Sequence, residues 1–129
     1  MQLKYRDKVA TQWQDQPLMY GELFALADWF SKQAPLDGVE RGGKVAIFCE
    51  NKVEWAITLL AAWYGKAIVV PIDHNSTSSE VAYILDDCQP EVICCSAQTS
   101  PVAMTAIDEA SHAPTLLDLD AVAWPLQYQ

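Results

Sequence analysis

The sequence predicts an α/β domain in which a parallel β-sheet is flanked by helices in βαβαβ order, with a small N-terminal hairpin before it. Three continuous apolar runs, at residues 44–49, 67–72 and 92–95, carry this prediction. Strands covered on both faces have such runs. Between the runs, apolar residues recur every three or four positions, which is the period of a helix. Strands that alternate with helices over short connections favour a parallel sheet wound right-handedly.

The first 34 residues predict the hairpin and one helix. Two short extended segments, 9–14 and 17–20, are separated by two residues and indicate antiparallel strands. From Tyr20 the spacing changes to three and four, at Leu23, Leu26, Ala27, Phe30 and Ala34. This spacing predicts an amphipathic helix over 21–33 that ends near Pro35.

The first apolar strand is followed by a predicted helix over 52–64. Asn51 is the expected N-cap, and Glu54 stands three residues later, where a capping box needs it. Gly65 is expected to take the left-handed conformation that ends the helix. Trp63, like Trp29 in the preceding helix, lies off the main apolar stripe. Both are therefore candidates for surface that another part of a larger protein covers.

The second half of the chain predicts two more helices and a fourth strand. Thr77 and Glu80 form a capping-box pair that opens a helix over 77–88. Pro101 suits the first turn of a helix over 101–110, and residues 114–119 predict a strand. A chain of 129 residues has the length of one domain, so we expect a single domain over 1–129.

Charge and composition argue against several classes of function. The net charge is −9 and the eight Lys and Arg residues are dispersed, so we expect no nucleic-acid partner. The longest apolar run, 56–64, is interrupted by Thr58 and is far shorter than the roughly 20 residues of a membrane span. The first residues lack the apolar segment of a secretory signal. We therefore expect a cytoplasmic protein without a membrane span.

The four cysteines do not indicate a metal site or a disulfide framework. Cys49, Cys88, Cys94 and Cys95 contain no C-x-x-C spacing, and the last two are neighbours on a predicted strand, where side chains point to opposite faces. We interpret them as small buried hydrophobic residues in a reducing compartment, with a redox-sensitive thiol as the alternative.

Residues 38–44 fit the phosphate-binding pattern G-x-x-x-x-G-K, but Val45 stands where a magnesium-binding Ser or Thr belongs. A phosphate loop leaves a strand and enters a helix, so that backbone N–H groups converge on the anion. Here the loop follows a helix and enters a strand. We therefore interpret Gly42 and Gly43 as a tight turn, and Lys44 as a solvated residue at the start of a strand.

Two histidines are candidate site residues. His74 follows Asp73 at the carboxyl end of a strand, where open α/β sheets bind ligands, although a lone His in such a place is more often a loop residue. His112 is a weaker candidate. Asp73 together with Glu50, at another strand end, would also suit a phosphoacceptor receiver domain, but the acidic pair and the Lys of that fold are not evident.

Several short segments together form a longer pattern. They are MYGEL at 19–23, GGKVAI at 42–47, NKVEW at 51–55, VPID at 70–73, EVAYILDD at 80–87 and PEVI at 90–93. In order and in register, they resemble the N-terminal segment of the adenylate-forming enzymes, the superfamily of acyl-CoA synthetases and peptide-synthetase adenylation domains. Two turn positions depart from the family pattern: Gly43 stands where Asp is usual, and Lys66 where Gly is usual.

The resemblance implies an ATP-dependent ligase in which a carboxylate and ATP form an acyl-adenylate, from which a thiol such as coenzyme A takes the acyl group. ATP, magnesium and coenzyme A are the implied cofactors of the parent enzyme. The catalytic motifs of the family are its Ser/Thr/Gly-rich loop with Lys, its aromatic-Thr-Glu motif, its ribose-binding Asp and its C-terminal Lys. None has a counterpart in these 129 residues, so no catalytic, cofactor-binding or metal-binding residue is carried over.

We therefore expect the front portion of the larger N-terminal domain of such a ligase, acting as scaffold and inactive in isolation. Its expected partner is the rest of the ligase chain, and exposed apolar surface is expected to cause self-association. The alternative is a stand-alone α/β binding or interaction module without catalysis.

Overall fold

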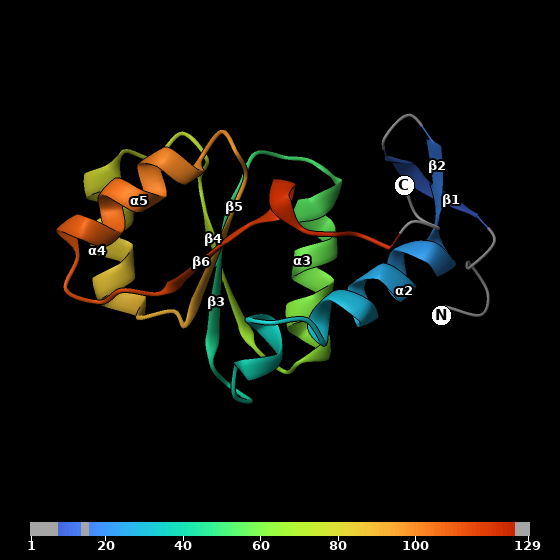
Figure 1. Cartoon of the computed structure of the whole chain (residues 1–129), viewed down its shortest axis with the longest axis horizontal. Helices are drawn as coiled ribbons and strands as arrows, with labels where there is room; N and C mark the ends of the chain where they lie inside the picture. The colour runs from blue at the N-terminus through green and yellow to red at the C-terminus, as the bar shows by residue number, and fades with distance from the viewer. Residues whose placement is uncertain (1–7, 14–15, 126–129) are drawn as a thin grey trace.

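A computed structural model describes residues 8–13 and 16–125, and its centre is a four-stranded parallel sheet in the order β4-β3-β5-β6. The strands are β3 (Lys44–Phe48), β4 (Ile68–Ile72), β5 (Val92–Cys95) and β6 (Thr115–Asp118). Helices α4 (Ser78–Cys88) and α5 (Ser100–Glu109) cover one face, and α3 (Val53–Tyr64) covers the other (Figure 1). The predicted α/β fold class and the fourth strand are confirmed.

An outer layer and a hairpin complete the domain. Helix α2 (Tyr20–Ser31) packs on α3, on the side away from the sheet (Figure 1). Strands β1 (Val9–Trp13) and β2 (Gln16–Met19) pair antiparallel at one end of α2, as predicted. No helix among the described residues is long and apolar enough to cross a membrane.

The central strand β3 divides two hydrophobic cores. Val45 and Ile47 face α3, whereas Ala46 and Phe48 face α4 and α5. Their exposed fractions lie between 0% and 1%, which explains why the sequence shows a continuous apolar run here instead of alternation. The neighbouring cysteines of β5 follow the same rule: Cys94 belongs to the first core and Cys95 to the second, which confirms their predicted opposite orientations.

The start of α4 agrees with the sequence prediction, and that of α3 does not. The Thr77 hydroxyl accepts from the Glu80 N–H at 3.2 Å, and the Glu80 carboxylate accepts from the Thr77 N–H at 2.9 Å, which confirms the predicted capping box of α4. The prediction that Asn51 caps α3 is wrong. Lys52 is the N-cap and makes no side-chain cap, because an ammonium group has no acceptor for the N–H groups of the first turn; it bonds Asp120, 68 residues away, at 2.6 Å.

Helix α3 ends at Tyr64 as predicted, but the left-handed residue after it lies one position later than predicted. Gly65 has an ordinary φ of −80° and is the C-cap residue, whereas Lys66 takes the left-handed conformation with φ of 62°. The N–H of Lys66 bonds the carbonyl of Trp63 at 3.0 Å, and the N–H of Ala67 bonds that of Ala62 at 2.9 Å, which is the Schellman pattern. The departure of Lys66 from the family's Gly therefore places a lysine at a position that favours glycine.

The two tryptophans expected at an uncovered surface behave differently. Trp29 is half-buried, and its ring centroid lies 5.8 Å from that of Trp124, so this chain itself covers it. Trp63 is 70% exposed at the end of α3, which otherwise buries Ile57 and Ala61. Only Trp63 therefore remains a candidate for surface that another part of the protein covers.

The backbone at Gly65 leads to a test with a matched control. We expect Gly65→Ala to raise the free energy of unfolding by roughly 0.4–1 kcal/mol, because alanine restricts the unfolded chain and fits this φ. Gly42 also has open space around its Cα, but its φ is +83°. Gly42→Ala should therefore lower the free energy of unfolding by about 1 kcal/mol. Urea unfolding of both variants measures the difference, and equal losses would contradict the assignment of the turn.

Candidate functional site

The topology places the candidate site at the carboxyl ends of β3 and β5. After β3 the chain passes to α3 on one face of the sheet, and after β5 it passes to α5 on the other (Figure 1). Open α/β sheets bind ligands in the crevice where neighbouring strands send their connections in opposite directions. We call the space between these two strand ends the switch-point crevice.

Two buried hydroxyl groups occupy the β5 side of the switch-point crevice. Ser96 Oγ donates to Glu50 Oε1 at 2.5 Å, and Thr99 Oγ1 donates to the carbonyl of Phe48 at 2.6 Å. Ser96 and Thr99 also exchange bonds, since the N–H of each donates to the hydroxyl of the other at 3.0 and 3.2 Å. Both side chains are buried, so these bonds satisfy groups that would otherwise be costly to remove from water.

An ion pair closes the outer part of the crevice. Asp120 follows β6, and its Oδ1 lies 2.6 Å from Lys52 Nζ, while its Oδ2 accepts from the Ala97 N–H at 2.7 Å. This Lys52–Asp120–Ala97 clamp joins the loops after β3, β5 and β6. The Ala97 N–H and then the Lys52 ammonium lower the pKa of Asp120.

The acid groups of the crevice are ionised at neutral pH. Burial by itself would raise the pKa of Glu50, but the hydroxyl of Ser96 and the charge of Lys52 outweigh burial, and the pKa is lowered. Burial likewise disfavours the charge on Lys52, but the bond and charge of Asp120 raise its pKa. The crevice therefore holds two carboxylates and one ammonium group.

This arrangement does not fit a nucleotide phosphate. The space is occupied by hydrogen-bonded side chains of the chain itself, the carboxylates of Glu50 and Asp120 repel an anion, and the ammonium of Lys52 is already paired. Among residues 8–13 and 16–125, no group of three or more His, Cys, Asp or Glu side chains is arranged to hold a metal ion.

The loop at 38–44 precedes β3, so it lies at the amino ends of the strands, opposite the switch-point crevice. The N–H of Gly43 bonds the carbonyl of Glu40 at 2.8 Å, and Gly42 has a φ of +83°, which confirms the predicted tight turn. A Cβ on Gly43 would overlap the Glu91 carboxylate and lie 2.9 Å from the Glu40 carbonyl oxygen. The glycine found in place of the family's Asp is therefore required by its neighbours.

His74 lies at a separate cavity of about 460 Å³ beyond the ends of β3 and β4. Its Nδ1 is 3.9 Å from Asp73 Oδ1, and Asp73 accepts from the Asn75 N–H at 2.9 Å, which forms a local turn. The structure does not bring Glu50 into this cavity. His112 lies elsewhere and has a structural contact, since its Nε2 donates to the carbonyl of Pro90.

The thiols are unsuited to nucleophilic chemistry. Cys49 lines the cavity near His74, but burial, with the nearby charge of Glu50, raises its pKa to about 12. Burial also raises the pKa of Cys95 to about 12 and that of Cys94 still further above the ordinary value. These three thiols stay protonated at neutral pH, in agreement with their interpretation as buried hydrophobic residues. Cys88 is only half-buried, so that interpretation does not hold for it.

Sequence reasoning missed Lys52, Ser96, Thr99 and Asp120. The spacing of Ser96 and Thr99, directly after a buried strand and before Pro101, is a local signal of side chains that bond the start of a helix. The pairing of Lys52 with Asp120 carries no local signal, because the two residues lie 68 positions apart.

The clamp predicts a pH-dependent contribution to stability. We expect Asp120→Asn to lower the free energy of unfolding at pH 7 by about 1 kcal/mol, because Lys52 loses its anionic partner and both side chains are partly exposed. The pKa of Asp120 is lowered from its ordinary 3.8 in the folded chain, so the unfolded chain takes up the proton first as the pH falls. The difference between the two proteins should be full above about pH 5 and should shrink below it.

Urea unfolding of both proteins between about pH 7 and pH 3 measures this difference. The exposed carboxylate of Asp108, on α5, provides the control, and Asp108→Asn should stay within about 0.5 kcal/mol of the natural chain throughout. A difference for Asp120→Asn that does not change with pH would contradict a contribution from the ionised clamp.

Comparison with known proteins identifies the family. The model of the AMP-binding enzyme family matches residues 2–128. The chain is 30% identical over 95 residues to the N-(5-amino-5-carboxypentanoyl)-L-cysteinyl-D-valine synthase of Penicillium rubens, covering 74% of this chain and 2% of that protein. It is 28% identical over 104 residues to the long-chain-fatty-acid–CoA ligase FadD13 of Mycobacterium tuberculosis, covering 81% of this chain and 21% of the ligase. The chain thus spans a small part of these relatives.

Solved structures show the same architecture. A benzoate CoA ligase from Burkholderia xenovorans superimposes with a TM-score of 0.82 at 18% identity, over 97% of this chain and 27% of the ligase. A fatty acyl CoA synthetase from Mycobacterium tuberculosis gives a TM-score of 0.74 at 27% identity, over 84% of this chain and 22% of the synthetase. With a family model that matches nearly its whole length, the chain belongs to the AMP-binding enzyme family of adenylate-forming ligases.

Proposed function

We propose that this chain is the front part of an ATP-dependent acyl-CoA ligase. In the proposed reaction a carboxylate oxygen attacks the α-phosphorus of ATP, and pyrophosphate leaves as the acyl-adenylate forms. The thiolate sulfur of coenzyme A then attacks the acyl carbon, and AMP leaves as the thioester forms. The similarity to fatty-acyl-CoA ligases supports the thioester step, and the similarity to peptide synthases keeps amino-acid activation as the nearest alternative.

We assign a scaffold role to this portion, and one observation carries the assignment. The switch-point crevice, where such a sheet would bind a ligand, is filled by Glu50, Ser96 and the Lys52–Asp120–Ala97 clamp. These groups hold the loops after β3, β5 and β6 against one another. The portion would thereby give the nucleotide-binding part of the ligase a rigid support, and we derive no reaction step from its own residues.

This proposal predicts that the isolated chain neither binds nor uses ATP. Calorimetric titration with Mg·ATP should give no saturable heat, and a panel of carboxylic acids with ATP should release no pyrophosphate above the protein-free rate. Micromolar affinity for ATP would contradict the scaffold role and favour a stand-alone binding module. The reading frame of the parent gene gives the complementary test, because a ligase requires a Ser/Thr/Gly-rich loop ending in Lys downstream.

The two edges of the sheet differ in their ability to accept another strand. On β6, the Thr115 N–H donates to the Glu91 carbonyl and so faces the neighbouring strand β5. The N–H groups of Leu116 and Asp118 alternate with it along the strand and therefore face away from the sheet. On β4, the Ile68 N–H bonds Gly43, and Pro71 faces outward without an N–H group. Within the described residues, β6 is therefore the edge that is open to pairing.

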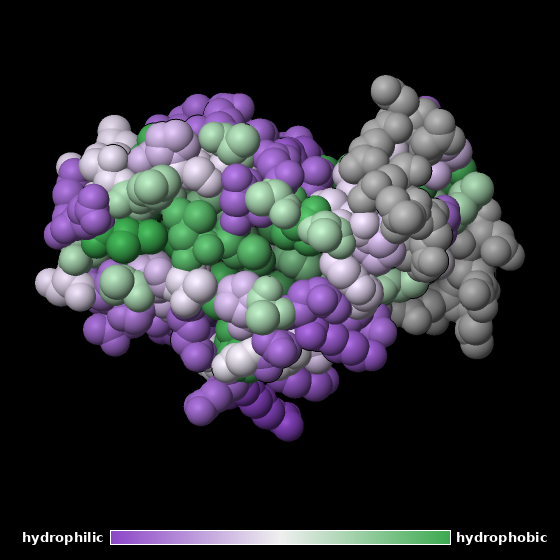
Figure 2. Space-filling model, in the orientation of Figure 1, coloured by the Kyte–Doolittle hydropathy of each residue, from purple (hydrophilic) through white to green (hydrophobic). Residues whose placement is uncertain are grey.

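The β6 edge is also apolar. Figure 2 shows a hydrophobic band across the middle of this face, where Figure 1 places β6 between α5 and α3. Leu116 and Leu117 on this strand are only half-buried. We propose that a strand from the rest of the ligase pairs with β6, since this chain spans only about a quarter of the solved ligases whose fold it shares, 22% and 27% of their lengths.

An uncovered β6 edge predicts self-association of the isolated chain. Thr115→Lys places a charge on the exposed side of this edge strand, which opposes pairing between copies at little cost to the fold. We expect the sedimentation coefficient of the natural chain to rise with protein concentration and that of the variant to stay constant. Met104→Lys, at a 60% exposed site on α5, is the matched control and should behave as the natural chain does. Equal effects of both lysines would exclude β6 as the contact.

A further inference from the structure

The net negative charge of this chain lies entirely in its second half. Residues 1–66 contain eight Asp or Glu and eight Lys or Arg, whereas residues 67–129 contain nine Asp or Glu and neither Lys nor Arg. The two helices of the second half, α4 and α5, pack against each other and cover the face of the sheet away from α3 (Figure 1). Ser78 Oγ, at the start of α4, donates to Glu109 Oε1, at the end of α5, at 3.3 Å. This helical layer is the anionic side of the domain.

Both helices present a large apolar side chain and an acid to solvent. Tyr83 on α4 is 72% exposed, and Met104 on α5 is 60% exposed. One helical turn after them lie Asp87 and Asp108, both of which are exposed. Residues four apart share one face of a helix. We call the surface formed by Tyr83, Asp87, Met104 and Asp108 the α4–α5 face.

The acids of the α4–α5 face do not stabilise the helices that carry them. The C-terminus of a helix is the negative end of its dipole, where Lys and Arg are favourable and acids are unfavourable. Asp87 and Asp108 nevertheless lie in the last turns of α4 and α5, and neither turn contains a basic residue. Asp86, by contrast, has a structural role, because its Oδ1 accepts from the N–H groups of Ser111 and His112. The charges of Asp87 and Asp108 add to those of the helix ends and attract cations.

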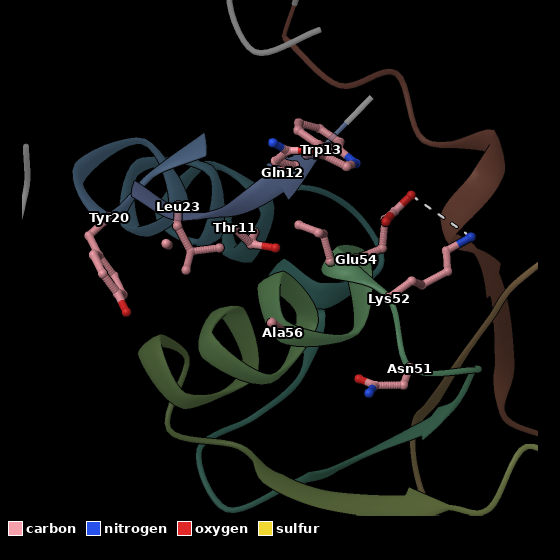
Figure 3. Close-up of a pocket in the computed structure, with 11 residues that line it drawn as sticks. Thr11, Gln12, Trp13, Tyr20, Leu23, Asn51, Lys52, Glu54 and Ala56 are labelled. Atoms are coloured by element: carbon pink, nitrogen blue, oxygen red, sulfur yellow. Dashed lines mark ion pairs between the residues drawn. The ribbon is translucent and has the colours of Figure 1, made fainter. Parts of the chain in front are cut away.

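These acids also have no basic partner within the described part of the chain. No ion pair there joins an acid of α4 or α5 to a lysine or arginine. The lysines that form ion pairs do so elsewhere: Lys32 with Asp28 on α2, and Lys52 with Asp120 and with Glu54 at the start of α3 (Figure 3). A cation that meets the α4–α5 face therefore comes from outside this part of the chain.

Charge and apolar surface together select the partner. Nucleic acids and anionic membranes are repelled by this face. A second copy of the chain has no cationic surplus to match it, because residues 1–66 hold equal numbers of acidic and basic side chains. A polyamine would pair with the acids and leave Tyr83 and Met104 uncovered. A polypeptide segment that combines Lys or Arg with large apolar side chains matches both features.

We propose that the α4–α5 face docks a basic amphipathic helix of a partner protein. The apolar side of that helix would contact Tyr83 and Met104, of which the methionine adapts readily to the shape of a partner. Its Lys or Arg side chains would lie near Asp87 and Asp108 and fix its orientation. The proposal does not depend on the ligase reaction, since none of these four residues belongs to the switch-point crevice.

The test titrates rhodamine-labelled peptides with the protein at physiological ionic strength and follows fluorescence anisotropy. We expect a saturable rise with the basic amphipathic peptide KLAKLAKKLAKLAK. Its counterpart KSAKSAKKSAKSAK keeps the charges without the leucines and should bind several-fold more weakly, and the acidic ELAELAEELAELAE should not bind. Equal binding of the two basic peptides would show that charge alone decides, as it would for a polyamine, and would overturn the proposal. The absence of saturable binding would do the same.

A variant without the apolar groups tests their part. Tyr83→Gln combined with Met104→Gln keeps residues that favour helices at both positions. We expect it to weaken binding of the leucine peptide several-fold and to leave that of the serine peptide unchanged. Trp63→Gln, at a 70% exposed site at the end of α3, is the matched control and should have no effect. An equal loss with the control would place the peptide elsewhere, and urea unfolding verifies that each variant folds.

A second variant tests the position of the charges. Asp87→Asn combined with Asp108→Asn should weaken the binding of both basic peptides several-fold, without loss of stability, because acids at these helix ends are unfavourable. Asp37→Asn combined with Glu40→Gln removes the same charge at exposed sites before β3 and should leave the binding nearly unchanged. Equal weakening by the two pairs would mean that only the net charge of the protein matters, and the docking face would be rejected.

Discussion

The burial of β3 from Val45 to Phe48 is the constraint on which the rest of the structure depends. This strand pairs with β4 on one side and β5 on the other, and its side chains are enclosed on both faces. A strand with apolar residues on both faces needs a helical layer on each side. That requirement sends the connection after β3 to one face and the connection after β5 to the other. The switch-point crevice is therefore a direct result of how β3 is covered.

The contents of this crevice support the proposed scaffold role. In a ligand-binding α/β protein, the loops at a switch point present backbone N–H groups and open space. Here Glu50, Ser96 and Thr99 bond one another and the end of β3, and Asp120 holds Lys52. The same position in the fold thus acts as a brace between three loops. A brace of this kind suits a domain whose neighbours perform the chemistry.

The sequence was sufficient for features that depend on neighbouring residues. The apolar runs located β3 and β5 because burial on both faces leaves no polar positions there. The run of β4 also located a strand, but β4 is an edge strand with Ile68 52% exposed, so burial on both faces does not explain its composition. Thr77 with Glu80 located the start of α4 because both groups of a capping box lie within one turn. The sequence did not show which residues far apart in the chain meet, such as Lys52 and Asp120, and it misplaced details of both ends of α3. The N-cap of α3 is Lys52 in place of the predicted Asn51, and its side chain has no acceptor for the first turn. The left-handed position expected at Gly65 falls on Lys66, because Gly65 keeps a negative φ as the C-cap of the helix.

The proline in β4 has a consequence for how copies of this domain can meet. Because Pro71 removes an outward N–H group from one edge, sheet growth from head to tail through β4 and β6 would leave bonds unmade. Two copies that instead pair their β6 strands about a twofold axis would form hydrogen bonds at both open edges at once. Such an isologous contact closes on itself. In the self-association that we propose, the placement of a single imino acid would therefore favour finite pairs over fibres.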